Sequence, residues 1–332
     1  GDDVLPWMRE NDVPLIDSAQ TVRSLDGRLI SANAYLGADA MLPALQSGAD
    51  VVITGRVSDP ALYLAPLMHR FGWKADDWQR LGQGIVVGHL LECAAQVSGG
   101  YIADPGFLDV PGLAEVGFPL AEVQADGGFV ITKLPGTGGR VDRLTCTAQL
   151  LYELEDPQRY LQPDVIADFS GVRFSDEGAD RVGVQGGSGT ARPAELKVTL
   201  GYCDGFIGEG QISYAGPGAR ARGELALQIM EHRLRVRGLD AMEHRGELIG
   251  VNAMHGAKLG TDREPYEVRL RMAVRTETRA QAELVGQEVE ALYLNGPAGG
   301  GGVTQSVREV VAAASALIPR EAIRTGCQVL EL

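Results

Sequence analysis

Residues 48–60 have the sequence Gly-Ala-Asp-Val-Val-Ile-Thr-Gly-Arg-Val-Ser-Asp-Pro, and this stretch decides the fold that we expect. The apolar run at 50–54 between two glycines predicts a short strand buried on both faces, as in a parallel sheet. Arg56, Ser58 and Asp59 follow where that strand would end, with Asp59 as the expected N-cap of a helix that starts at Pro60. In an open α/β sheet, ligands bind at that end of a strand.

A neighbouring strand is expected at 29–37, followed by a helix at 38–46. Together with 50–54 they form a β-α-β unit, for which a right-handed crossover is the rule. Asn33 and Tyr35 lie on one side of the first strand, so they would face the same crevice as Arg56 and Asp59. Alternatively, Tyr35 is a core aromatic whose hydroxyl is bonded locally.

A second helix is predicted from 76 to 98, ending at a pair of glycines. Its spacing places four polar side chains on one face of an otherwise apolar segment, namely His89, Glu92, Cys93 and Gln96. An internal hydrogen-bond network would satisfy them, and so would a ligand. In the second case His89 and Glu92 form an acid/base pair, or join Asp59 at a metal ion, although a closed metal site needs about four ligands.

Composition restricts the class of partner. The chain has 332 residues, of which 45% are hydrophobic, and 44 acidic against 30 basic side chains give a net charge of −14. Such a surface repels nucleic acid and anionic lipid, so neither is expected as a partner. An anionic small-molecule substrate would need a local basic pocket.

The four cysteines are far apart and include no C-x-x-C pair, which indicates neither a zinc knuckle nor a disulfide scaffold. A reducing cytoplasm fits this pattern. No apolar run reaches the roughly 18 residues of a membrane span, and no signal peptide is visible. We therefore expect a cytoplasmic location.

Two glycine-rich loops are candidate anion sites. The first follows a predicted hairpin of strands at 120–123 and 129–133 and precedes a helix at 141–155; its candidate residues are Gly136, Thr137, Gly138, Gly139 and Arg140. Backbone N–H groups at a helix N-terminus favour an anion, but a plain tight turn explains the same glycines. The second loop, 295–302, contains Asn295 and Gly296 and is either a surface loop or a close approach to a ligand.

From Val165 the pattern changes to short runs of period two. Strands are expected at 165–174, 181–184, 195–200, 208–214, 247–251 and 267–276, and helices at 216–237 and 280–292. The predicted fold class is therefore an α/β part of parallel β-α-β units at 1–160, followed by an α+β domain at 161–332 built on a mostly antiparallel sheet. A pocket between the two parts is expected.

Several motifs resemble the acyclic terpene utilisation AtuA family. They are Ser-Ala-Asn-Ala-Tyr-Leu-Gly at 31–37, Ile-Thr-Gly-Arg-Val-Ser-Asp at 53–59, Gly-His-Leu-Leu-Glu-Cys at 88–93, Gly-Thr-Gly-Gly at 136–139, Asn-Gly-Pro at 295–297 and Val-Arg-Glu-Val at 307–310. The resemblance implies a branched acid or its CoA thioester as ligand, in the breakdown of acyclic terpenoid acids. It also implies a further α/β segment upstream of residue 1, so that this chain is a fragment or relies on a second subunit or a homo-oligomer.

We expect an enzyme that acts on a branched acyl-CoA or carboxylic acid by hydration, C–C cleavage or hydrolysis. His89, Glu92 and Asp59 would move protons, while Arg56 and the glycine-rich loops would hold the anionic part. No cofactor is indicated, and a CoA thioester would be the substrate. A non-catalytic partner subunit of a thioester-handling assembly is the alternative, and a metal-dependent hydrolase is a third option.

Overall fold

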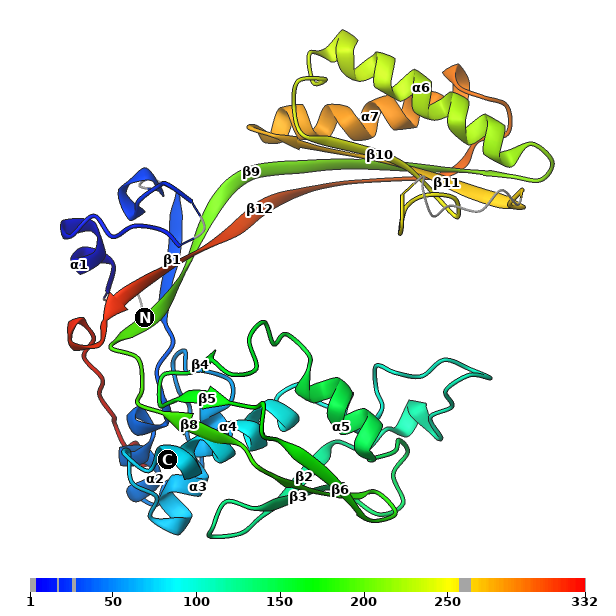
Figure 1. The fold of residues 1–332 in the computed structure, drawn as a ribbon. Coiled ribbons are helices and arrows are strands. Elements are labelled where there is room, and N and C mark those ends of the chain that lie inside the picture. The colour runs from blue at the N-terminus through cyan, green and yellow to red at the C-terminus, as the bar shows by residue number, and fades with distance from the viewer. Residues whose placement is uncertain (1–3, 17, 26–27, 257–263, 332) are drawn as a thin grey trace. The chain divides into compact units, whose positions relative to one another are not determined.

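The computed structural model of the protein describes residues 4–16, 18–25, 28–256 and 264–331 (Figure 1). The chain forms two compact units with separate hydrophobic cores: the first takes Gly1–Ser24, Ser31–Leu200 and Ser315–Leu332, and the second Leu25–Ile30 and Gly201–Ala314. Three strands have residues in both units: β1 (Leu29–Ala34), β9 (Glu195–Ala215) and β12 (Gly301–Pro319). The domain boundary expected at residue 160 is not tested by this division into compact units and stays a prediction.

Helices of the first unit are short, apart from two that pack on each other. These two are α3 (Ala61–Phe71) and α4 (Trp78–Leu91). The others are α1 (Leu5–Glu10), α2 (Leu42–Gln46) and α5 (Arg143–Leu150), with 3-10 turns at η3 (Ala38–Ala40), η4 (Gln96–Ser98), η5 (Leu113–Glu115) and η7 (Arg320–Ala322). A further turn, η2 (Val22–Leu25), lies at the boundary of the two units.

Two small antiparallel sheets complete the first unit. One has the order β2-β3-β7-β6, from β2 (Pro119–Val123), β3 (Phe129–Lys133), β6 (Arg173–Gly178) and β7 (Arg181–Gln185). The other has the order β4-β5-β8, from β4 (Tyr160–Leu161), β5 (Ile166–Asp168) and β8 (Ser188–Thr190). The hairpin predicted from Asp126-Gly127-Gly128 is confirmed as β2 and β3.

The core of the first unit forms where α4 lies on β8. Leu81, Ile85 and Leu90 of α4 are fully buried. Gly82 allows the close approach, because a Cβ atom at that position would lie 2.0 Å from the Ser188 carbonyl oxygen. Glycine in a helix interior costs about 1 kcal/mol relative to alanine, so packing is the reason for its presence here.

In the second unit two helices cover one face of a sheet (Figure 1). The sheet places β11 (Glu267–Thr276) between β9 and β10 (His244–Ile249), both antiparallel to it, and β12 pairs with β9. The helices are α6 (Ala219–Arg237) and α7 (Arg279–Asn295). The strand predicted at 267–276 is confirmed with those bounds, because inward Val268, Leu270, Met272 and Val274 alternate with polar residues.

The predicted parallel β-α-β unit is wrong. Residues 51–54 form no strand, and Val51 and Ile53 are 74% and 91% exposed. The parallel pairing is reduced to one isolated bridge between Leu36 and Val57, and β9 is the strand that pairs with β1. The first part of the chain is therefore a mixture of helices and antiparallel sheets. An apolar run of four residues indicates burial only when a neighbouring strand exists to cover it.

Two helix boundaries also differ from the prediction. The helix expected to reach residue 98 ends at Leu91 with Glu92 as its C-cap, and Ala94 has a positive φ of 50° that a continuing helix does not allow. Asp59 is not an N-cap: α3 follows Pro60 without a side-chain capping bond, and Asp59 pairs with Arg56 instead.

A buried carboxylate holds the turn after β1. Asp164, 4% exposed, accepts a hydrogen bond of 2.9 Å from the backbone N–H of Ala38, and Gly37 is needed because a Cβ there would lie 2.4 Å from Asp164 Oδ1. Burial raises the pKa of this carboxyl from 3.8 to about 6. The folded protein therefore binds this proton more tightly than the unfolded chain does.

This shift predicts a pH dependence of stability. Because the folded state binds more protons between the two pKa values, the free energy of unfolding should fall as the pH rises from about 4 to about 6. Asp164→Asn removes the titration, so the difference in unfolding free energy between the two proteins should change by roughly 3 kcal/mol over that range. Urea denaturation at about pH 4, 5, 6 and 7 measures it. A difference that does not vary with pH would contradict the assignment.

Candidate binding cavity and buried histidine pair

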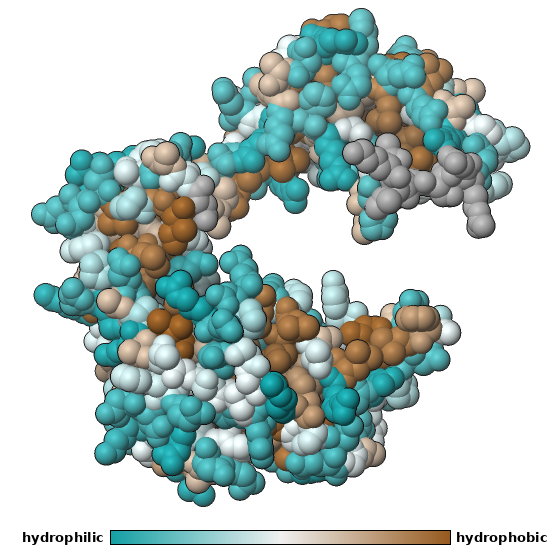
Figure 2. Space-filling view, in the orientation of Figure 1, coloured by the Kyte–Doolittle hydropathy of each residue, from teal (hydrophilic) through white to brown (hydrophobic). Residues whose placement is uncertain are grey.

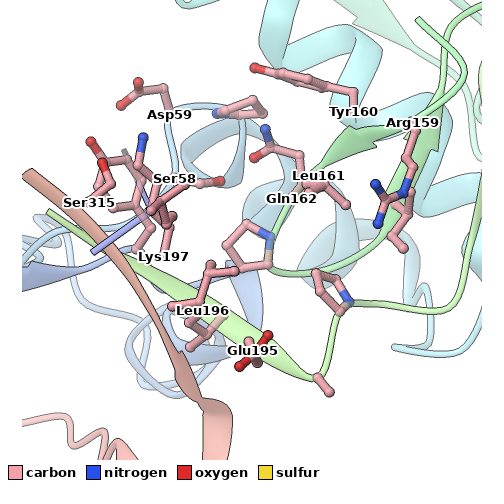
Figure 3. A pocket seen from close by; sticks show the side chains of 18 of the residues that line it. Ser58, Asp59, Arg159, Tyr160, Leu161, Gln162, Glu195, Leu196, Lys197 and Ser315 are labelled. Atoms are coloured by element: carbon pink, nitrogen blue, oxygen red, sulfur yellow. The ribbon is translucent and has the colours of Figure 1, made fainter. Parts of the chain in front are cut away.

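A cavity of about 830 Å³ lies in the first unit (Figure 3). Its walls come from the loop before α3, the segment 155–166, the start of β9 and the end of β12. Part of the wall is apolar, formed by Ile16, Leu161, Ile166, Leu196 and Leu317. The charged side chains in the lining are Asp59, Glu155, Arg159, Glu195 and Lys197.

Of the site residues predicted from the sequence, Asp59 and Tyr35 line this cavity. Arg56 holds both: its guanidinium lies 3.3 Å from the Asp59 carboxylate and 4.1 Å from the centre of the Tyr35 ring. Cation–π and ionic contacts of this kind fix orientation more than they stabilise the fold. Tyr35, Arg56 and Asp59 thus lie together through a loop contact, whereas the parallel sheet expected to bring Asn33 to the same crevice is absent from the described residues and Asn33 does not line the cavity.

Lys197 and Arg159 supply positive charge without a carboxylate partner in the part of the chain that the structure describes. The Lys197 ammonium lies 5.6 Å from the centre of the Tyr35 ring. Figure 3 shows Lys197 and Asp59 on one side of the cavity and Arg159 on the other. Both cations are available to an anionic ligand.

His89 is buried beside the cavity and does not line it. Its Nδ1 lies 3.0 Å from Glu92 Oε1, and its Nε2 lies 3.2 Å from the Leu150 carbonyl oxygen. Because a carbonyl only accepts, Nε2 carries a hydrogen and donates it.

Tyr160 separates this pair from the cavity. Tyr160 lines the cavity, and its ring meets the His89 ring edge-on, with 5.5 Å between the ring centroids. The Phe169 ring also packs against His89, with 5.4 Å between the ring centroids. Burial, with the nearby negative charge of Glu92, raises the pKa of the Tyr160 phenol. The phenol therefore stays neutral and can donate a hydrogen bond.

Cys93 and Gln96 lie beyond the end of α4, so the predicted polar stripe is interrupted after Glu92. Burial raises the pKa of the Cys93 thiol, with further contributions from the charges of Glu92, Glu153 and Asp59. A thiol in that setting is a poor nucleophile. Burial likewise raises the pKa of Cys146 to about 12.

The first glycine-rich loop uses its backbone amides internally. Thr137, Gly138, Gly139 and Arg140 donate to the carbonyls of Leu134, Glu115, Pro111 and Ser98. The Arg140 guanidinium bonds Asp142, the N-cap of α5, and Gly136 has a positive φ of 81° in the turn. The amides that were predicted to bind an anion thus already hold protein carbonyls, and none of these residues lines the cavity.

The second loop belongs to the second unit. The Asn295 side-chain amide donates to the Ala291 carbonyl and the Gly296 N–H to the Leu292 carbonyl, so both residues close the end of α7. Asn33 lies half-buried in β1 and outside the cavity lining.

Within the described ranges, no three His, Cys, Asp or Glu side chains are close enough to share a metal ion. Asp59 therefore does not join His89 and Glu92 in such a group. Among the same residues, no helix is both long and apolar enough to cross a membrane.

Sequence reasoning missed Arg159, Tyr160 and Lys197. Lys197 alternates with buried Leu196 and Val198 in a period-two run, so its exposure was predictable, but its place at a cavity was not. Arg159 and Tyr160 lie in a polar segment without a motif, and only the tertiary fold brings them to Asp59.

The contacts of His89 predict a structural role that mutation can measure. His89→Ala would remove the partner of the Leu150 carbonyl and of the half-buried Glu92 Oε1 and open a cavity, so the free energy of unfolding should fall by roughly 3 kcal/mol. Urea denaturation measures this loss, with His69→Ala, at an exposed position of α3, as the matched control expected within about 0.5 kcal/mol of wild type. Equal stability of the two variants would show that His89 is not held as described.

Comparison with known proteins supports one family. No curated protein and no solved structure matches the chain. A family model described as acyclic terpene utilisation family protein AtuA matches residues 1–329, nearly the whole chain. The motifs that suggested the resemblance include Tyr35, Arg56 and Asp59, which meet at the cavity. The chain therefore belongs to the acyclic terpene utilisation AtuA family.

Proposed function

We propose that the protein is an enzyme that binds a branched carboxylic acid or its acyl thioester in the cavity of the first unit. The observation that carries the proposal is the combination of an apolar wall with two cations, Lys197 and Arg159, that have no carboxylate partner among the residues that the structure describes. A volume of about 830 Å³ is in the range of small-molecule sites. The family's link to acyclic terpene utilisation fits a branched hydrocarbon chain in that space.

Asp59 is the side chain that we assign to proton transfer. Hydration, C–C cleavage and hydrolysis of an acyl compound each need a group that moves a proton near the carbonyl carbon. Asp59 lines the cavity and its position is set by Arg56. The His89–Glu92 pair, behind Tyr160, would act by fixing the position of that ring.

Charge removal tests the binding mode. Lys197→Ala combined with Arg159→Ala should weaken binding of a branched acyl-CoA and of the free acid by about tenfold or more, with a smaller effect at high salt, because two exposed charge contacts are lost. Isothermal titration calorimetry at low and high ionic strength gives the affinities. Turnover is measured separately for wild type and Asp59→Asn, because Asp59 is the side chain assigned to proton transfer. Lys74→Ala, an exposed lysine outside the cavity, is the control. Unchanged affinity in the double variant would contradict the proposal.

A non-catalytic partner subunit is the second candidate, favoured by exposed aromatic side chains. Tyr101, Phe107 and Phe118, in the segment between η4 and β2, are 76%, 87% and 66% exposed. Figure 2 shows hydrophobic residues gathered on the surface of the first unit near α5. Apolar groups concentrated in this way are typical of protein contact surfaces.

Light scattering after size exclusion separates the two candidates. If the chain serves as a partner subunit, wild type should associate with itself or with a co-encoded protein, and Phe107→Ser with Phe118→Ser should abolish association, because the apolar contact is removed. Leu144→Ser, an exposed apolar residue of α5, is the control. Monomeric behaviour of wild type in every mixture, together with turnover, would contradict the partner role.

A further inference from the structure

Two buried polar side chains in the cavity wall each carry an oxygen atom that has no hydrogen-bond partner among the described residues. Ser58 is 4% exposed and Gln162 is 7% exposed, and both line the cavity (Figure 3). Within the described residues, Ser58 Oγ and Gln162 Oε1 are buried without a partner. Such a group costs roughly 1–3 kcal/mol, and native proteins retain it where water or a ligand satisfies it.

The backbone keeps both residues in place. The Ser58 N–H donates to the Leu36 carbonyl at 2.8 Å, and its carbonyl accepts from Ala61 at 3.0 Å. The Gln162 N–H donates to the Val165 carbonyl at 3.1 Å. Since the main chain is fixed on both sides of the cavity, the unpartnered side chains belong to the built wall rather than to a loose loop.

Ser58 lacks the contacts of a nucleophile. A catalytic serine needs a base within hydrogen-bond reach, and Ser58 Oγ has no such neighbour in the described chain. Its hydroxyl can donate and accept, and Gln162 needs a donor for its oxygen and an acceptor for its NH₂ whichever way the amide is turned. The unpartnered atom of Gln162 is Oε1, which needs a donor; a carboxylate or a thioester carbonyl accepts only, so neither satisfies that oxygen.

We propose that Ser58 and Gln162 recognise a ligand group that both donates and accepts hydrogen bonds, set within the chain of the acid. This inference rests on the proposed function, because it concerns the same ligand in the same cavity. Two sources supply that chemistry: a hydroxyl on the acyl chain, or the secondary amide of a pantetheine-like thioester arm. The pair thus selects against a plain hydrocarbon acid.

Three probes distinguish the sources. They are isocaproate, its α-hydroxy derivative, and the isocaproyl thioester of N-acetylcysteamine, which carries a secondary amide. Dissociation constants are measured by titration calorimetry with wild type, Ser58→Ala and Gln162→Leu. Wild type should bind the hydroxy acid or the amide thioester about tenfold or more tightly than isocaproate, and both variants should lose this preference while still binding isocaproate.

Two residues outside the cavity serve as controls. Ser98 Oγ and Gln83 Oε1 are also buried without partners in the described part of the chain, and neither residue lines this cavity. Ser98→Ala and Gln83→Leu should keep the preference. Urea denaturation should show that Ser58→Ala and Gln162→Leu are at least as stable as wild type, because each removes an unsatisfied group.

Three outcomes bear on the inference. A preference lost only in the two cavity variants supports it. Equal affinity of wild type for all three probes overturns it, and leaves the cavity as a site for plain branched acids. Failure of wild type to bind any probe overturns the proposed function and this inference together.

Discussion

The His89 imidazole is the contact on which the first unit depends. It lies between the Glu92 carboxyl, at the end of its own helix, and the Leu150 carbonyl, at the end of α5. The Gln149 side chain returns a bond of 2.8 Å to the His89 carbonyl, so the two helix ends are joined twice. Buried hydrogen bonds fix geometry strongly, because the alternative is an unpaired group in a medium of low dielectric.

This contact reaches the cavity through Tyr160. The phenol ring packs on His89 and Phe169 on one side and forms cavity wall on the other. A polar pair that looks catalytic in the sequence thus becomes a support that positions an aromatic wall. Asp59 lines the same cavity from the loop before α3, where Arg56 pairs with it. His89 and Glu92 support the cavity wall but do not line the cavity. The polar motif that contains them therefore does not mark the place where a ligand would bind.

Local patterns predicted those elements that have a local cause. β11 alternates strictly, the β2–β3 hairpin turns at Asp126-Gly127-Gly128, and α7 starts at Thr278 with a capping box to Gln281. The parallel unit failed because pairing is not local: β9, more than 150 residues further along, takes the place beside β1. Arg56 and Asp59 were placed near a ligand site because both follow one short segment, but Asp59 was expected as an N-cap rather than as the partner of Arg56, and Gln162 and Lys197 join Asp59 at the cavity only through the fold.

Polar groups of the glycine-rich loop at 136–140 and of the cavity wall differ in whether they have hydrogen-bond partners within the described chain. In the loop each amide from Thr137 to Arg140 has a carbonyl acceptor, although the chain needs glycines at positive φ to achieve it. Elsewhere in the described chain Ser98 Oγ and Gln83 Oε1 are also buried without partners, but neither of those residues lines the cavity. Because Ser58 Oγ and Gln162 Oε1 have no partner in the described part of the chain and lie on a fixed backbone in the cavity wall, their partner is best sought in the ligand.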